Sequence, residues 1–160
     1  MLGNYSTAIA EIKTIALEDY TKSANNTEAR LELNSGLDSL TIDDKQIFTG
    51  YSATGFRDAF NYANQEQKTN IIKELAKSFA STDHILFSEV LNQEFDKANA
   101  NIPLTLHTKT KSTELVERAG NKLLIKMGMA IGPQVEMYQE KPRQEPVDIG
   151  FGHVEERKID

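Results

Sequence analysis

Residues 64–99 read NQEQKTNIIKELAKSFASTDHILFSEVLNQEFDKAN, and they carry a clear apolar periodicity. The first half has an apolar stripe at a 3.6-residue period, which predicts an amphipathic helix: Ile71, Ile72, Leu75 and Phe79. Asn64, with Gln67 three residues later, fits a capping box at the start of this helix. The second half has a similar stripe and predicts a second helix: Ile85, Leu86, Val90, Leu91 and Phe95. Because the connector is short, the two helices are expected to form an antiparallel hairpin.

The composition predicts one soluble domain. The chain has 160 residues, of which 39% are hydrophobic, enough for a single core. It contains no cysteine, which excludes disulfides, thiolate zinc sites and cysteine nucleophiles. The N-terminus lacks the basic and apolar segments of a signal peptide, and no apolar run reaches the ~20 residues of a membrane span. We therefore expect a protein that is cytoplasmic or part of an assembled particle, with no membrane span.

The segments before this hairpin also favour helices. Apolar residues at helical spacing predict them at 6–20, 27–33, 42–49 and 56–63. Glycines and asparagines at 25–26, 34–36 and 50–55 separate these segments. Residues 1–100 are accordingly predicted to form an N-terminal helical layer around the central αα-hairpin.

The pattern changes to alternation after residue 100. Ile102, Leu104 and Leu106 alternate with polar residues, which predicts a strand, and Ser112 fits the N-cap of a short helix over 113–119. Period two continues over 122–131 and predicts a strand, with a break at 132–133 and a further strand to Tyr138. The overall prediction is an α+β fold with a helical region at 1–100, a small β-rich portion at 101–138 and an extended C-terminal tail at 139–160.

The C-terminal part supplies the candidate interaction residues. Gly128, Ala130 and Gly132 would leave one face of the predicted strand nearly bare, so another backbone could approach it closely. Methionine on the other face offers an adaptable apolar surface. Alternation over 147–151 predicts either a last strand or part of the tail. The resulting candidate contact residues are Met127, Gly128, Met129, Gly132, Val147, Ile149 and Phe151.

Two stretches match known chemical motifs only in part. Gly50 and Gly55 have P-loop spacing, but Phe56 and Arg57 stand where a phosphate-binding loop needs Lys and Ser or Thr. A loop that caps the next helix through Ser52 or Thr54 is therefore favoured. His153, Asp148 and Glu155 are the one local grouping that offers metal ligands, whereas His84 and His107 have no carboxylate at ligand spacing. No cofactor is predicted.

The charge distribution limits the partners. The net charge is −6, and the excess of acidic residues lies within residues 1–100, which disfavours nucleic acid there. A basic stretch at 109–126 lacks aromatic residues for base stacking. The leading hypothesis is a non-enzymatic interaction or assembly subunit, for example of a phage, virion or secretion-type particle, that self-associates. One alternative is an acidic regulator that binds a basic protein site through Glu66, Glu74, Glu89 and Glu94, and another is a metal-dependent hydrolase.

Overall fold

The fold is built around a five-stranded sheet with the strand order β5-β6-β4-β3-β9. This computed structural model describes residues 2–4, 9–11, 13–14, 16, 18–94, 102–132, 140–144 and 150–160. Adjacent strands run antiparallel except β9, which joins β3 in parallel. The strands are β3 (Ala24–Leu33), β4 (Leu40–Phe48), β5 (Ile85–Leu91), β6 (Leu104–Ser112) and β9 (Val154–Ile159).

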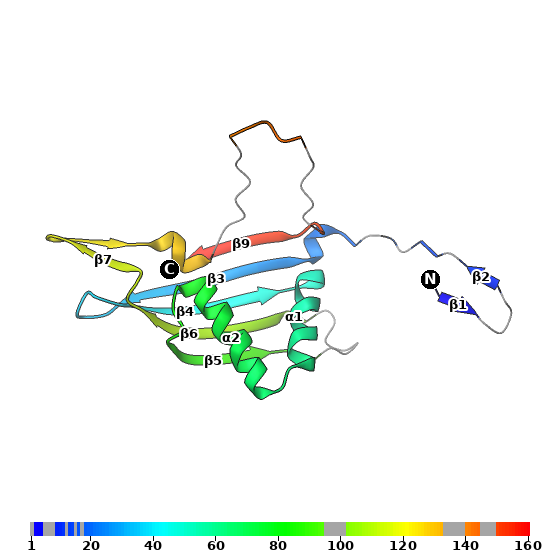
Figure 1. The fold of residues 1–160 in the computed structure, drawn as a ribbon, viewed down its shortest axis with the longest axis horizontal. Coiled ribbons are helices and arrows are strands. Elements are labelled where there is room, and N and C mark those ends of the chain that lie inside the picture. The colour runs from blue at the N-terminus through cyan, green and yellow to red at the C-terminus, as the bar shows by residue number, and fades with distance from the viewer. Residues whose placement is uncertain are drawn as a thin grey trace.

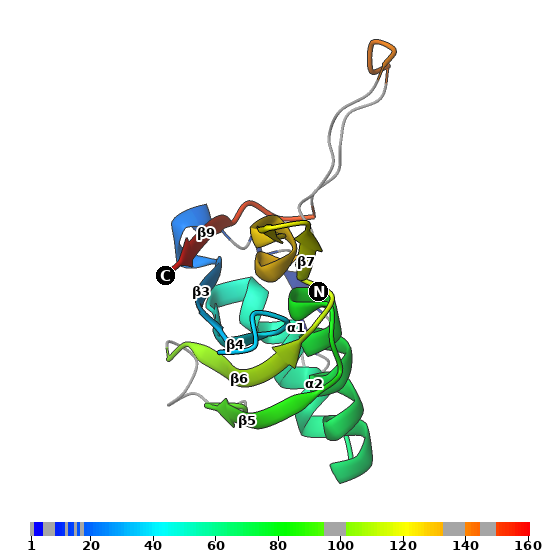
Figure 2. The same cartoon turned by 90° about the vertical axis from the view of Figure 1, so that its left-hand side faces the viewer.

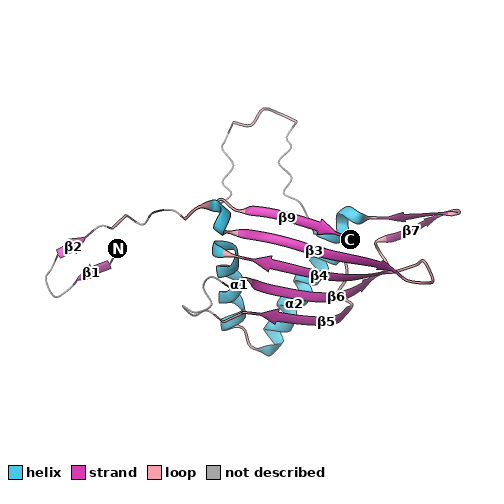
Figure 3. Cartoon of the chain, turned by 180° about the vertical axis from the view of Figure 1, so that it is seen from behind, coloured by secondary structure: helices cyan, strands magenta, loops and turns pink. Residues whose placement is uncertain are grey.

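Two helices lie between β4 and β5 in the sequence and pack on one face of the sheet. They are α1 (Gly50–Tyr62) and α2 (Gln65–Ala80). Figures 1 and 2 show both on the same side, and Figure 3 shows the opposite side, where no described helix covers the strands. We call these two sides the covered face and the open face.

The smaller elements surround this two-layer body. A short 3-10 helix, η1 (Tyr20–Lys22), precedes β3, and a hairpin of β7 (Val116–Ala119) and β8 (Lys122–Ile125) follows β6. A second 3-10 helix, η2 (Met127–Ile131), comes next. Strands β1 (Leu2–Asn4) and β2 (Ile9–Glu11) pair with each other, and Figure 1 shows them away from the main sheet.

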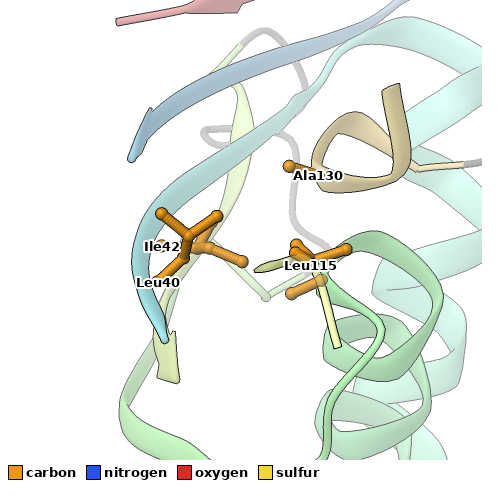
Figure 4. Close-up of a cluster of buried hydrophobic side chains, with 5 residues drawn as sticks. Leu40, Ile42, Leu115 and Ala130 are labelled. Carbon is orange, nitrogen blue, oxygen red and sulfur yellow. The ribbon is translucent and has the colours of Figure 1, made fainter. Parts of the chain in front are cut away.

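The core follows from strict alternation in the two central strands. Every second residue of β4 and β6 is buried on the covered face. At one end of that face, Leu40 and Ile42 of β4 meet Leu115 and Ala130, as Figure 4 shows. At the other end, Phe48 packs with Phe60 of α1. The core is therefore two apolar clusters, with the centre of the sheet between them.

The predicted N-terminal helical layer is wrong. Residues 27–33 and 42–49, predicted as helices, belong to β3 and β4, and the second helix of the predicted hairpin is strand β5. In the predicted helix 6–20, residues 9–11 form β2, and several other positions lie outside the described residues. The observed fold is a mostly β structure with two helices in the middle of the chain, because cross-strand pairing, and not the local apolar stripe, organises residues 24–48.

The C-terminal predictions are partly wrong. The short helix over 113–119 is absent: those residues form a turn and β7, and Gly120 has φ +64 in the hairpin turn. The predicted strand 122–131 ends as β8 at Ile125, where η2 follows. Residues 154–159 are strand β9 of the main sheet and not part of a tail. The predicted strand at 133–138 lies outside the described residues.

Several element predictions are confirmed. α2 begins at the predicted capping box, with Asn64 and Gln67 bonded in both directions. The strand predicted from the alternation of Ile102, Leu104 and Leu106 is β6, which begins at Leu104, and the helix predicted at 56–63 is the second half of α1.

Candidate functional site

A chain of polar side chains crosses the centre of the covered face. The Thr27 hydroxyl donates to Gln46 Oε1 at 3.0 Å. Gln46 Nε2 in turn donates to both carboxylate oxygens of Asp44, at 3.1 and 2.9 Å. Thr27 and Gln46 are directly opposed in the β3–β4 register, so the strand pairing itself sets this contact. All three side chains lie between the two apolar clusters.

Asp44 is the titratable member of this chain. Only 4% of the residue is exposed. Burial raises the pKa of the Asp44 carboxyl to about 6, although the hydrogen bonds from Gln46 act in the opposite direction. A carboxyl with this pKa suits proton transfer, but the helices and strands enclose it. Asp44 is therefore a structural group, because a substrate cannot reach it.

The open face carries two rows of side chains that run across the strands. The β3–β9, β3–β4, β4–β6 and β5–β6 registers define a first row of Lys158, Glu28, Lys45, His107 and Glu89. The neighbouring second row is Arg30, Asp43, Lys109 and Phe87. Among the Lys, Arg, Asp and Glu side chains of each row, the sign of the charge alternates, with His107 and Phe87 as the neutral members. Directly opposed charges of opposite sign stabilise a sheet, so the rows are a solvated charge pattern and not a patch of one sign.

His107 and Asp43 link the two rows. His107 Nε2 lies 2.7 Å from Asp43 Oδ1. The Phe87 ring stands at the edge of the imidazole, with ring centroids 5.1 Å apart. This contact joins the edge strand β5 to the polar centre of the open face.

Strand β5 forms one outer edge of the sheet and is unusually apolar for an edge. Leu86, Phe87 and Leu91 are 51%, 45% and 44% exposed. Its single charged residue is Glu89, whereas β9 at the opposite edge carries two glutamates, an arginine and a lysine in six residues. Charged side chains, lysine above all, commonly block edge strands against further pairing. β9 is protected in this way and β5 is not.

Both ends of β5 are fixed to the body. At the C-terminal end, Arg57 of α1 is 3% exposed and donates from Nε to the Asn92 carbonyl at 3.2 Å and from Nη2 to the Ile102 carbonyl. At the N-terminal end, the Thr82 hydroxyl donates to the Lys111 carbonyl of β6 at 2.9 Å. The exposed edge is consequently held in an extended form before any partner meets it.

The predicted contact residues are only partly brought together. Met127, Gly128 and Met129 lie in η2 and not on a strand, although both methionines are nearly half exposed. Gly132 does allow a close approach, but of this chain's own Phe79, whose ring occupies the place that a Cβ would take. Phe151 contacts the rings of Tyr51 and His153. Val147 and Ile149 lie outside the described residues.

The glycine motif at 50–55 is not a loop. It forms the first part of α1, with Gly50 at φ +54 against Ser23 and Lys22. Ser52 and Thr54 therefore lie inside the helix and do not cap it. The Thr54 hydroxyl instead bonds the Gly50 carbonyl one turn back.

The histidine predictions have separate outcomes. His153 Nε2 lies 3.5 Å from Glu155 Oε1, as their shared strand face predicted, while Asp148 lies outside the described residues. Glu155 also pairs with Arg157 at 3.3 Å. Within the described ranges, no group of three or more His, Asp and Glu side chains could hold a metal ion.

Two surface depressions have balanced charge. One, of about 640 Å³ at the C-terminal end of α2, has Lys77 and Lys111 facing Asp83 and Glu114. The other, of about 600 Å³, lies beside the chain's C-terminus and is lined by three basic and three acidic side chains: Arg30, Lys45, Lys158, Glu28, Asp43 and Asp160. Neither has the net charge that would select a phosphate or a metal ion.

The predicted acidic helical face is not formed. Glu66 and Glu74 lie on α2, but Glu89 lies on the open face of β5 and Glu94 follows that strand. Strand pairing of residues 85–91 separates the four carboxylates onto different elements.

Comparisons with family models, with curated proteins and with solved structures find no match for this chain. No helix in the described part of the chain is long and apolar enough to cross a membrane.

Proposed function

We propose that this chain is a non-enzymatic assembly subunit, and that copies of it join through the β5 edge of the sheet. The observation that carries the proposal is the contrast between the two sheet edges. β5 presents Leu86, Phe87 and Leu91 to solvent, while β9 presents charged side chains. An exposed apolar edge with unpaired backbone groups is a template for the addition of another strand.

The fixed ends of β5 support the same function. A strand that is already extended loses little conformational freedom when it pairs, so more of the contact energy remains for binding. Arg57 and Thr82 provide this rigidity from opposite ends of the strand. The edge therefore has both the apolar surface and the preorganisation that strand addition uses.

Sedimentation velocity over a range of concentrations tests this proposal. The wild-type chain is expected to associate, and Leu86→Lys is expected to weaken that association by about tenfold or more, because lysine on an edge strand opposes pairing. Two exposed residues away from the edge serve as controls: Leu37→Lys at the β3–β4 turn and Met129→Lys in η2. A wild-type chain that stays monomeric at every concentration would contradict the proposal, and so would an effect from Met129→Lys alone.

A further inference from the structure

We infer that β5 pairs with β5 of a second copy, antiparallel, about a two-fold axis that passes between the two Ser88 residues. This inference rests on the proposed function and adds the partner strand and its register. The two sheets would join into one sheet of ten strands, with the helices of both copies on the same side. Because the same surface meets itself, the contact closes as a dimer and does not propagate into a filament.

The register follows from the side chains that would oppose each other. In an antiparallel pair, directly opposed side chains lie on the same face, so a two-fold axis perpendicular to the sheet passes midway between the two copies of one residue, here called an axis at that residue. With the axis at Ser88, Leu86 lies opposite Val90 of the second copy, and Phe87 lies opposite Glu89. With the axis at Glu89, the two Glu89 carboxylates would face each other directly and repel.

The charge rows of the open face support the same register. With the axis at Ser88, the first row of one copy continues into the second row of the other. The first row ends in His107 and Glu89, and the second row ends in Lys109 and Phe87. Glu89 then lies in one row with Lys109 of the second copy, separated by the Phe87 ring, and the alternation of sign continues across the join. An axis at Phe87 would instead join two second rows, with a lysine on each side.

The length of the ladder is limited by an irregularity in β5. The β5–β6 register is regular over Phe87–Leu91 and shifts between Ile85 and Phe87, so a ladder centred on Ser88 is regular only as far as the irregularity at Leu86. Leu86, at this irregularity, and Phe87 are both about half exposed and would be covered by the second copy. A short ladder with apolar side chains on both faces is what the exposed surface of β5 offers.

Disulfide trapping in the full-length chain tests the register. The protein has no cysteine, so any disulfide must form at an introduced position. Ser88→Cys places two thiols across the axis, where directly opposed Cα atoms are about 4.5–5.5 Å apart in an antiparallel pair, within the range of disulfides. Ser88 is exposed, so its replacement should not disturb the fold. On mild oxidation, Ser88→Cys is expected to give a covalent dimer on a non-reducing gel.

Two further variants provide matched controls on the same strand. Glu89→Cys and Phe87→Cys, each alone, place the thiols on a diagonal at roughly 7–8 Å between Cα atoms, outside favourable disulfide geometry. Each variant alone should cross-link about tenfold more slowly than Ser88→Cys, because two thiols on a diagonal have a lower effective concentration than two directly opposed thiols. A mixture of the two variants places unlike partners directly opposite and should form the mixed dimer rapidly.

The outcomes separate this inference from the proposed function. Fast cross-linking of Ser88→Cys and of the mixture, with slow cross-linking of either single control, supports the two-fold pairing. If the wild-type chain associates and Leu86→Lys weakens that association, but Ser88→Cys reacts no faster than the controls, the two-fold register at Ser88 is overturned while assembly through the β5 edge stands. A chain that stays monomeric and does not cross-link overturns both.

Discussion

Asp44 and Gln46 occupy positions where a two-layer fold normally has apolar side chains. They alternate with less buried residues as Leu40 and Ile42 do, and face the covered side of β4. Gln46 satisfies both oxygens of the carboxylate, which limits the cost of burial without removing it. These two polar residues also explain why β4 was not predicted from the sequence. Asp44 and Gln46 interrupt the apolar alternation of Leu40, Ile42 and Phe48.

Replacing Asp44 with Asn should change how stability depends on pH. The pKa of Asp44 is raised from 3.8 to about 6, so the folded state keeps this proton more tightly than the unfolded state does. Well below pH 3.8 both states are protonated, and Asp44 costs nothing through ionisation. As the pH rises from about 4 to about 6, the unfolded state ionises while the folded state stays protonated, so stability is lost over this window, and above pH 6 the loss is complete. Since Asn cannot ionise, the stability of Asp44→Asn relative to wild type should increase by on the order of 3 kcal/mol between pH 4 and pH 7.5.

Urea unfolding at pH 4, 5, 6 and 7.5 measures this difference. Asp58→Asn on the exposed side of α1 is the matched control, and its stability relative to wild type should stay nearly constant over the same range. A difference between Asp44→Asn and wild type that does not change with pH would contradict the raised pKa of Asp44, because only equal pKa values in the folded and unfolded states remove the pH dependence.

The helix α2 is the element that the sequence predicted most completely. Its apolar stripe and its capping box are both local signals, and the segment forms the predicted helix because no strand pairing with a distant segment replaces it. Its end is equally local: Ser81 at φ 50 takes the left-handed conformation and its N–H bonds the Lys77 carbonyl. α2 therefore covers the sheet with boundaries that its own residues set.

Removal of the cap should weaken α2 measurably. Asn64 Oδ1 accepts from the Gln67 backbone N–H at 2.9 Å, and Gln67 Oε1 accepts from the Asn64 N–H at 2.8 Å. Asn64→Ala loses one of these bonds, and the expected cost is about 1 kcal/mol of unfolding free energy. Asn70→Ala, in the exposed middle of the same helix, should be neutral or stabilising by about 0.5 kcal/mol because alanine is the better helix former. Chemical denaturation compares the two, and equal effects would argue against a capping role.

Strand β5 shows the limit of local signals. Ile85, Leu86, Val90 and Leu91 fit a helical stripe, so the sequence favours continuing the hairpin. The competing signal was compositional: Ile85, Phe87 and Val90 are β-favouring residues next to a left-handed helix end. The pairing of β5 with β6, the next strand of the chain, decides the secondary structure, and a window confined to residues 85–91 does not contain that information. The candidate site was missed for the same reason, because Leu86 and Phe87 form an exposed edge only once residues 85–91 are a strand.

At the scale of the whole molecule, the two edges of the sheet differ: β9 carries charged side chains, whereas β5 is mostly apolar. The charged edge is strand β9, residues 154–159, which pairs with β3 although the two strands are far apart in the sequence. Sequence alternation could not place them, because parallel pairing with β3 joins residues 24–29 to residues 154–159. The sequence therefore predicted local elements of this fold, α2 and β6, but not the order of the strands.

Deletion of residues 154–160 should destabilise the protein without abolishing its fold. β9 is joined to β3 by backbone bonds from Val154 N to the Ser23 carbonyl and from Asp160 N to the Ala29 carbonyl, both 2.9 Å. Arg157 also donates to the Gly132 carbonyl at 3.3 Å. Loss of these bonds and of the cover over Ala29 should lower the free energy of unfolding by about 2–4 kcal/mol. The two apolar clusters that involve β4, β6 and the helices remain in place, so a four-stranded sheet should persist.

Thermal unfolding and amide hydrogen exchange check this expectation together. The truncated chain should melt at lower temperature, and amides of β3 should exchange faster while those of β4 and β6 stay protected, since only β3 gains a free edge. Lys158→Ala is the point control: its ammonium makes an exposed ion pair with Glu156 at 3.3 Å, which contributes little to stability. Unchanged melting and unchanged exchange in β3 after the deletion would mean that β9 is not part of the sheet in solution. In that case β3 would be a second open edge, and the contrast that singles out β5 for assembly would be lost.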